Sequence, residues 1–201
     1  MGTYNLATIT KKIYNSGFSL FYTKTLKDIL DIKKQSTLFS VVKKLVNAKI
    51  LIRIGRNKYL LKDGNIKDFS IANFIYNSSY ISFESALNFY GILSQFPYEI
   101  SNATSRKTVK KYFHDKIFTY THIQKKLFWG YEKKDGFIIA YPEKALLDQL
   151  YLSSKGYKKI NIDEYNFTNI NISRLKKYLK EYPKTKQFQK TIKGLKVYLN
   201  I

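Results

Sequence analysis

The chain has 201 residues, of which 36 are Lys or Arg and 14 are Asp or Glu, so its formal net charge at pH 7 is +22. An AT-rich genome enriches Lys, Asn, Ile, Tyr and Phe without a functional cause, but it favours Glu as well, so the excess of basic residues indicates an anionic partner such as the phosphates of nucleic acid. Cysteine is absent, which excludes disulfides and thiolate metal sites. No apolar run approaches the roughly 20 residues of a membrane span, and residues 1–10 lack a signal-peptide pattern. We therefore expect a cytoplasmic protein that does not contact a membrane.

The first 64 residues predict a winged helix-turn-helix domain. Apolar residues at helical spacing predict three helices, and two β-prone runs around a Gly-Arg-Asn-Lys turn predict a hairpin. We expect these elements at residues 5–16, 26–30, 36–48, 50–54 and 59–61, with an extended connector over 18–22. Gly17 should end the first helix, and Thr25 should cap the second. The third helix has one apolar stripe, which consists of Leu38, Val41, Val42 and Leu45.

The opposite face of the third helix and the hairpin carry the predicted DNA contacts. In a winged helix the third helix enters the major groove and the hairpin tip reaches the neighbouring backbone or minor groove. Residues 1–65 contain 13 basic and 3 acidic residues, a net charge of +10. We expect base contacts only from Gln35, Thr37, Ser40 and Arg56, since lysines more often contact phosphates. The predicted DNA-binding residues are Lys33, Lys34, Gln35, Ser36, Thr37, Ser40, Lys43, Lys44, Arg53, Arg56, Asn57 and Lys58.

Residues 65–201 predict a larger mixed α+β domain, so that the fold class of the whole chain is α+β. The polar segment 62–67 is the expected linker. Helices are expected at residues 69–76, 83–90, from 142 onward, at 172–181 and at 184–200, and strands at 99–104, 116–123, 127–131 and 137–141. Ser82 should cap the second of these helices, and Pro142 with Glu143 favours the start of the third. The last two helices make the C-terminus basic.

Three segments of this second part carry a family resemblance. They read YISFESALNFYG at residues 80–91, FWG at 128–130 and AYPEKALLD at 140–148. In this order, and after an N-terminal winged helix, they resemble the AbiEi family, the antitoxin and transcriptional repressor halves of abortive-infection type IV toxin-antitoxin pairs. The resemblance covers nearly the whole chain. One departure is Tyr90, which stands where relatives often carry His before the glycine.

The resemblance implies a protein with two activities. The family's winged helix binds inverted repeats upstream of its own operon, which gives negative autoregulation. The family's second domain counters a toxin similar to nucleotidyltransferases, directly or through the toxin's substrate, in phage resistance. We expect a monomer in solution that can pair cooperatively on DNA. The alternative is a docking module or protein-binding antitoxin that neutralises a partner without specific DNA recognition.

The inventory of catalytic groups predicts a protein that is not an enzyme and has no metal or cofactor site. Cysteine is absent, and His114 and His122 are the only histidines. The nearest enzyme-like pattern is Asp115 followed by Glu132 and Lys134, the loose order in which some nucleases hold Mg²⁺ and activate water. In a chain this rich in lysine such a pattern arises by chance, and a hairpin turn is where solvated charges are expected.

Two further groups of charges are expected to be structural or electrostatic. Glu143 favours a helix start, and Asp148 should be an exposed partner of Lys144 at the i, i+4 spacing. Residues 155–201 contain 12 basic and 3 acidic residues, a net charge of +9. These bases either extend the DNA footprint or face an acidic surface of the toxin or the toxin's nucleotide or RNA substrate.

Overall fold

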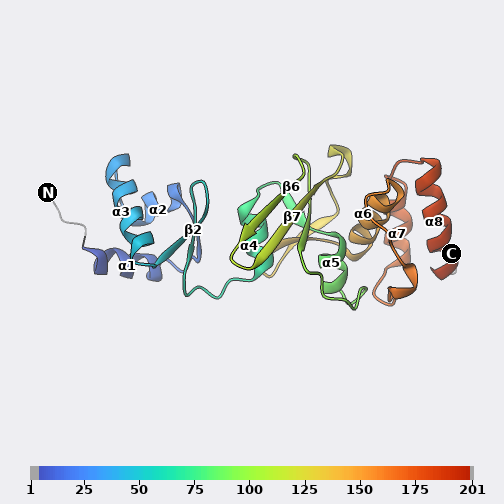
Figure 1. Cartoon of the computed structure of the whole chain (residues 1–201), viewed down its shortest axis with the longest axis horizontal. Helices are drawn as coiled ribbons and strands as arrows, with labels where there is room; N and C mark the ends of the chain where they lie inside the picture. The colour runs from blue at the N-terminus through green and yellow to red at the C-terminus, as the bar shows by residue number, and fades with distance from the viewer. Residues whose placement is uncertain (1–4, 200–201) are drawn as a thin grey trace. The chain divides into compact units, whose positions relative to one another are not determined.

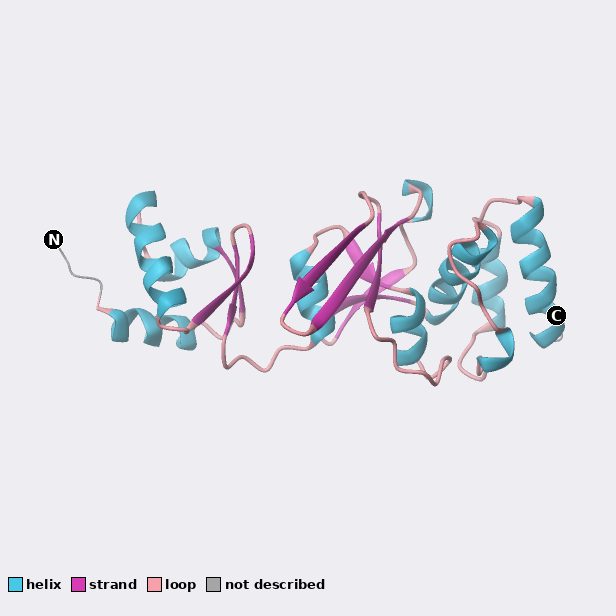
Figure 2. Ribbon diagram, in the orientation of Figure 1, coloured by secondary structure: helices cyan, strands magenta, loops and turns pink. Residues whose placement is uncertain are grey.

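The computed structural model describes residues 5–199 and has a mixed α+β fold, as predicted. Its residues 5–199 form eight α-helices and two β-sheets (Figures 1 and 2). The chain divides into two compact units, Met1–Ile75 and Tyr76–Ile201. The boundary expected after residue 64 falls one helix earlier than this division. Within residues 5–199, every helix is too short or too polar to cross a membrane.

The first unit consists of four helices and a small antiparallel sheet. In chain order its elements are α1 (Leu6–Asn15), β1 (Leu20–Tyr22), α2 (Thr23–Leu30), α3 (Gln35–Asn47), β2 (Leu51–Gly55), β3 (Lys58–Leu61) and α4 (Asp68–Ile75). The three predicted helices and the hairpin are therefore present at nearly the expected positions. Figure 1 labels α1, α2, α3, β2 and α4 of this unit.

Local capping signals explain where the first two helices begin and end. The side chain of Asn5 accepts a hydrogen bond from the Ala7 N–H at 2.9 Å, which caps α1. Gly17 follows the end of α1 with a φ of +71°, as a residue in the left-handed region should. The prediction for α2 was wrong at its start: Tyr22 is the N-cap, and Thr25 lies inside the helix. Strand β1 ends at Tyr22 and α2 begins at the next residue, so the helix starts three residues earlier than expected.

The sheet of the first unit has the strand order β1-β3-β2, and its neighbouring strands are antiparallel. The segment expected to be a simple connector therefore supplies an edge strand, because Leu20, Phe21 and Tyr22 pair with β3. The hairpin between β2 and β3 turns at Arg56 and Asn57. Asn57 has a φ of +59°, a conformation that Asn adopts more readily than most residues and that tight hairpin turns require.

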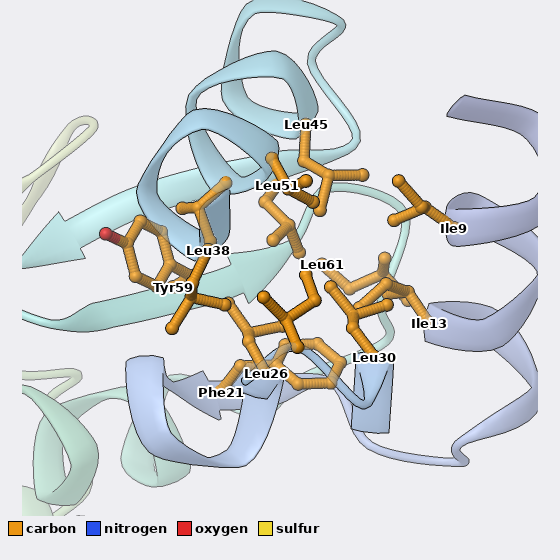
Figure 3. Close-up of a cluster of buried hydrophobic side chains, with 13 residues drawn as sticks. Ile9, Ile13, Phe21, Leu26, Leu30, Leu38, Leu45, Leu51, Tyr59 and Leu61 are labelled. Carbon is orange, nitrogen blue, oxygen red and sulfur yellow. The ribbon is translucent and has the colours of Figure 1, made fainter. Parts of the chain in front are cut away.

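A hydrophobic cluster packs α1, α2 and α3 against the sheet of the first unit (Figure 3). Figure 3 shows side chains of α1, α2 and α3 meeting those of the sheet. The predicted stripe of α3 is confirmed, since Leu38, Val41, Val42 and Leu45 are all buried. Because this stripe points into the cluster, the other side of α3 faces outward.

The second unit contains a six-stranded mixed sheet followed by a helical part. In chain order its elements are β4 (Ser79–Ile81), α5 (Phe83–Phe89), β5 (Ile100–Thr104), β6 (Val109–Phe113), β7 (Lys116–His122), β8 (Tyr131–Lys134), β9 (Phe137–Ala140), α6 (Pro142–Ser154), α7 (Ile172–Leu179) and α8 (Lys186–Leu199), with short 3-10 helices at Lys125–Leu127 and Ile162–Glu164.

The strand order of this sheet is β6-β7-β5-β4-β9-β8. Strands β4 and β9 are parallel, as are β5 and β7, and the other neighbours are antiparallel. The sequence predicted β5, β7 and β9 but missed β4, which has three residues, and β6, whose exposed lysines mask the strand pattern. The strand expected at 127–131 was wrong, because Lys125–Leu127 forms a 3-10 turn and β8 begins at Tyr131.

Helix α6 is the centre of the second unit. It packs against α5, α7 and α8, and its residues from Glu143 to Leu152 are all buried. A helix that is surrounded on all sides must bury its polar positions as well as its apolar ones. The partners of these buried charges are described below.

Candidate nucleic-acid interface

The outer face of α3 carries the polar residues that the sequence assigned to it. Gln35, Ser36, Ser40, Lys43 and Lys44 are exposed, and Thr37 is half-buried. Lys33 and Lys34 are exposed immediately before the helix, and Lys34 is its N-cap. The first turn of α3 therefore presents backbone N–H groups and two lysines at the positive end of the helix dipole, an arrangement that favours anions.

The hairpin tip is also basic, but one predicted residue is engaged within the unit. Arg53, Arg56 and Asn57 are exposed. The ammonium of Lys58 instead donates to the carbonyl of Ile75 at 2.9 Å, at the C-terminal end of α4, where the helix dipole favours a cation. It also lies 5.7 Å from the ring centroid of Tyr22 and 5.6 Å from that of Phe74. The structure thus gives Lys58 a stabilising contact within the first unit, and its contact with phosphate stays a prediction.

A hollow of about 430 Å³ joins α2, α3 and the hairpin tip. The Thr23 N–H donates to the Asn57 carbonyl at 3.1 Å, which holds the hairpin tip against the start of α2. Among residues 5–199, the Thr23 hydroxyl is one of the buried polar groups that have no hydrogen-bond partner. The residues that line this hollow are Thr23, Lys24, Lys27, Asp28, Gln35, Leu38, Phe39 and Asn57. Residues of α2 were not among the predicted site residues, because only the fold brings Lys24 and Lys27 beside Gln35.

A second hollow of about 340 Å³ lies between α3 and β2. It is lined by Phe39, Val42, Lys43, Val46, Arg53 and Tyr59. Phe39 belongs to both hollows, and its side chain is 48% exposed. Phe39 was not among the predicted site residues, although its position one residue after the buried Leu38 places it off the apolar stripe.

The electrostatics of this surface suit a polyanion. Of the residues that line the two hollows, Lys24, Lys27, Lys43 and Arg53 are basic, and Asp28 is acidic. Lysines spread over a surface in this way bind phosphates through long-range attraction and counterion release, with little demand on geometry. Amide and hydroxyl groups between the lysines, from Gln35 and Ser40, can hydrogen-bond to base edges.

In the second unit, two of the three segments that carry the family resemblance, residues 80–91 and 140–148, meet at one buried carboxylate. Asp148 Oδ2 accepts hydrogen bonds from the Tyr80 hydroxyl at 3.0 Å and the Ser82 hydroxyl at 2.9 Å, and Oδ1 accepts one from the Tyr182 hydroxyl at 2.7 Å. The ammonium of Lys144 forms an ion pair with Oδ1, and the side chains of both charged residues are 0% exposed. The expectation of an exposed Lys144–Asp148 pair was therefore wrong. We call these five residues the Asp148 cluster.

Aromatic rings and a glycine enclose the ammonium of Lys144. It lies 5.2 Å from the ring centroid of Trp129 and 5.4 and 5.5 Å from those of Tyr182 and Tyr80. A Cβ atom at Gly130 would lie 2.9 Å from Cγ of Lys144, and Gly130 has a φ of +75°, so glycine is required there on both counts. The FWG segment therefore serves as one wall of the Asp148 cluster.

Burial sets the protonation states within the Asp148 cluster. It raises the pKa of Tyr80 and of Tyr182 well above the ordinary value of 10, and the negative charge of Asp148 raises both further. Burial lowers the pKa of Lys144, while Asp148 opposes that change by stabilising the ammonium. Both tyrosines are thus held as neutral hydrogen-bond donors to the carboxylate. The hydrogen bonds to Asp148 connect β4, α6 and the segment after α7, because Tyr80, Asp148 and Tyr182 lie in these three parts of the chain.

Two more acidic residues of the resemblance segments are structural in the same way. Glu143 accepts a hydrogen bond from the Asn171 N–H at 2.8 Å and lies 3.4 Å from the guanidinium of Arg174, so it joins α6 to the start of α7. Glu84 accepts a hydrogen bond from the side-chain amide of Gln149 at 2.7 Å. Ser82 occupies the N-cap of α5 as predicted, but its hydroxyl is directed to Asp148 rather than to the helix.

The nuclease-like pattern is not assembled. Asp115 lies in the turn between β6 and β7, at the opposite edge of the sheet from Glu132 in β8. The ammonium of Lys134 lies 5.3 Å from the ring centroid of Phe89. Within residues 5–199, three or more His, Asp or Glu side chains nowhere gather in a way that could hold a metal ion.

The basic C-terminal helices present their lysines to the outside. Arg174 is partly engaged, since its guanidinium contacts Glu143 and lies 4.9 Å from the ring centroid of Tyr141. The exposed bases of this region include Lys176, Lys177, Lys180, Lys184, Lys186, Lys190, Lys193 and Lys196. Searches of protein-family models and of curated proteins gave no match to this chain.

Proposed function

We propose that Met1–Ile75 is a winged helix-turn-helix that binds duplex DNA, with α3 in the major groove and the β2–β3 hairpin as the wing. The order α1-β1-α2-α3-β2-β3 and the sheet order β1-β3-β2 support this proposal. The observation that carries it is the shared hollow between Gln35 of α3 and Asn57 of the hairpin tip. Two exposed polar elements that border one hollow can contact the same duplex at once.

The side chains divide into two groups on this duplex. Lys33, Lys34, Lys43, Lys44 and Arg53 contact phosphates and set affinity and register. Gln35, Thr37 and Ser40 on α3, with Arg56 on the wing, contact base edges, because their side chains carry the donors and acceptors that such contacts need. The hollow also adds Lys24 and Lys27 of α2 to the phosphate contacts. Phosphate contacts bind any duplex, so sequence preference must come from the second group.

We further propose that the chain is the antitoxin and autorepressor of a type IV toxin-antitoxin operon. This step rests on the resemblance of three segments of the chain to the AbiEi family. Two of these segments supply Tyr80, Ser82, Lys144 and Asp148 to the Asp148 cluster, and the third places Trp129 beside the Lys144 ammonium. In this proposal the winged helix binds inverted repeats upstream of the operon. The second unit, which has no catalytic role, counters a nucleotidyltransferase-like toxin in the cytoplasm.

A gel shift on the DNA upstream of the gene, with random DNA as competitor, tests the DNA-binding proposal. We expect preference for the native sequence and a steep fall of affinity with salt. The variant Lys43→Ala/Lys44→Ala should weaken binding, whereas Lys11→Ala/Lys12→Ala removes the same charge from α1 and should weaken it less. Equal binding to random DNA would refute the repressor and favour the protein-binding alternative.

Co-expression with the toxin gene, scored by cell survival, tests the antitoxin proposal. The proposal requires a nucleotidyltransferase-like gene directly beside this one. The fragment 76–201 should lose operator binding and retain protection, provided that circular dichroism shows it to be folded. Protection by the fragment 1–75 alone, with none from a folded 76–201, would instead make repression the whole antitoxin mechanism.

A further inference from the structure

Phe39 is an apolar side chain on an otherwise polar face of α3. It lies four residues after Gln35 and four before Lys43, so the three side chains follow one line along the helix surface. Its side chain is 48% exposed, although four other apolar positions of α3 are buried in the core of the unit. Covering the exposed half of this ring with an apolar group of a ligand would remove more apolar surface from water and so stabilise the complex.

The surroundings of Phe39 indicate what covers it. The hollow on one side of the ring has Gln35 and Asn57 on its walls, and the hollow on the other side has Lys43 and Arg53. Hydrogen-bond donors and cations therefore flank an apolar ring at the centre of the face. This arrangement matches a DNA major groove, where phosphates and polar base edges surround the C5 methyl group of thymine, the apolar group of that groove.

We infer that Phe39 packs against thymine C5 methyl groups and thereby selects thymine in the binding site. This inference rests on the proposed DNA binding by α3 and adds the base that the helix prefers. Gln35 lies one helical turn from Phe39, about 6 Å along the axis of α3. This distance corresponds to about two base steps of DNA. Since Gln pairs with adenine through two hydrogen bonds, the preferred site contains an adenine and a thymine within about two base pairs of each other.

Replacing thymine by uracil in the probe tests this inference directly. The fragment upstream of the gene is amplified with dTTP or with dUTP, which gives two duplexes that differ only in the C5 methyl groups. We expect the wild-type chain to bind the uracil duplex about fourfold more weakly for each methyl group that the ring covers. In Phe39→Ala the two duplexes should bind equally, and in Phe39→Leu part of the difference should remain.

Lys43→Ala is the matched control, because it removes a phosphate contact from the neighbouring turn. It should weaken binding to both duplexes by the same factor and leave their affinity ratio unchanged. Circular dichroism checks that each variant is folded. We expect Phe39→Ala to fold, because the side chain of Phe39 is half exposed and lies outside the buried stripe of α3.

The outcomes separate this inference from the proposal on which it rests. Equal binding of both duplexes by the wild type, or a ratio that persists in Phe39→Ala, overturns the role of Phe39 and leaves DNA binding intact. A wild-type chain that does not prefer the upstream fragment to random DNA overturns the proposed function and this inference together. A ratio that depends on Phe39 supports both.

Discussion

Replacement of Asp148 by Asn is the sharpest structural test of the second unit. Asn has nearly the same shape as Asp but no negative charge, so the ammonium of Lys144 loses its ion-pair partner at a position that is 0% exposed. The hydroxyls of Tyr80, Ser82 and Tyr182 also lose part of their acceptor, because an amide offers one oxygen where the carboxylate offers two. We expect the second unit to be strongly destabilised.

Two routes give the size of the loss. A buried ion pair that loses one partner costs about 3–5 kcal/mol of stability. The chain can avoid an unpaired charge by leaving Lys144 neutral, and removing a proton from a group with an ordinary pKa of 10.5 costs about 4.8 kcal/mol at pH 7, at about 1.36 kcal/mol per pH unit. The cost of deprotonating Lys144 is therefore the upper limit for the cost of its unpaired charge. We expect Asp148→Asn to lower the free energy of unfolding by about 3–5 kcal/mol.

The second route also predicts how the loss depends on pH. In Asp148→Asn, burial holds the pKa of Lys144 low in the folded state, while the unfolded chain keeps the ordinary value of 10.5. The unfolded state then binds more protons, so the stability of the variant rises as the pH approaches 10, by up to about 1.4 kcal/mol per pH unit. Above pH 10 the raised pKa values of Tyr80 and Tyr182 act in the opposite direction, because only the unfolded tyrosines ionise.

Urea unfolding followed by tryptophan fluorescence measures this effect. Trp129 is the single tryptophan of the chain and lies against Lys144, so it reports on the second unit. Glu99→Gln is the control, because it breaks an ion pair with Lys110 whose side chains are 30% and 55% exposed, and it should cost less than about 1 kcal/mol. Lys144→Met/Asp148→Asn should recover much of the loss. A loss below about 1 kcal/mol for Asp148→Asn, or a loss that is the same at pH 7 and pH 9.5, would refute the reasoning.

Three further predictions concern the first unit. Lys43→Ala or Lys44→Ala should weaken binding to all duplexes about equally and reduce the slope of log affinity against log salt by about 1 for each phosphate contact, as measured by salt-dependent titration. Gln35→Ala or Ser40→Ala should change which sequences bind, by roughly 1–3 kcal/mol for each base contact, and binding selection from random DNA would reveal an unchanged preference if these residues do not read bases. Lys58→Met should lower the thermal stability of the first unit, by about 1 kcal/mol for the lost hydrogen bond to Ile75, and leave the salt slope unchanged; a reduced slope would return Lys58 to the phosphate contacts.

Local signals in the sequence determined much of the first unit and part of the second. The stripe of Leu38, Val41, Val42 and Leu45 predicted α3 and its buried face, because helical periodicity depends on residues only three or four apart. The turn at Arg56 and Asn57 predicted the hairpin, and Pro142 marked the first residue of α6. The strands β4 and β6 escaped prediction because the first is very short and the second carries lysines at exposed positions.

Tertiary structure alone decided which charged residues are available to a partner. The sequence predicts the same phosphate-binding role for Lys58 and Lys43. In the structure the Lys58 ammonium donates to a carbonyl 17 residues away, while Lys43 is exposed. Asp148 satisfies the spacing of an exposed i, i+4 pair, but the hydroxyls of Tyr80 and Tyr182, 68 and 34 residues away, meet it in a buried cluster. Burial and long-range partners depend on how distant elements pack, and residue spacing along one helix does not specify that packing.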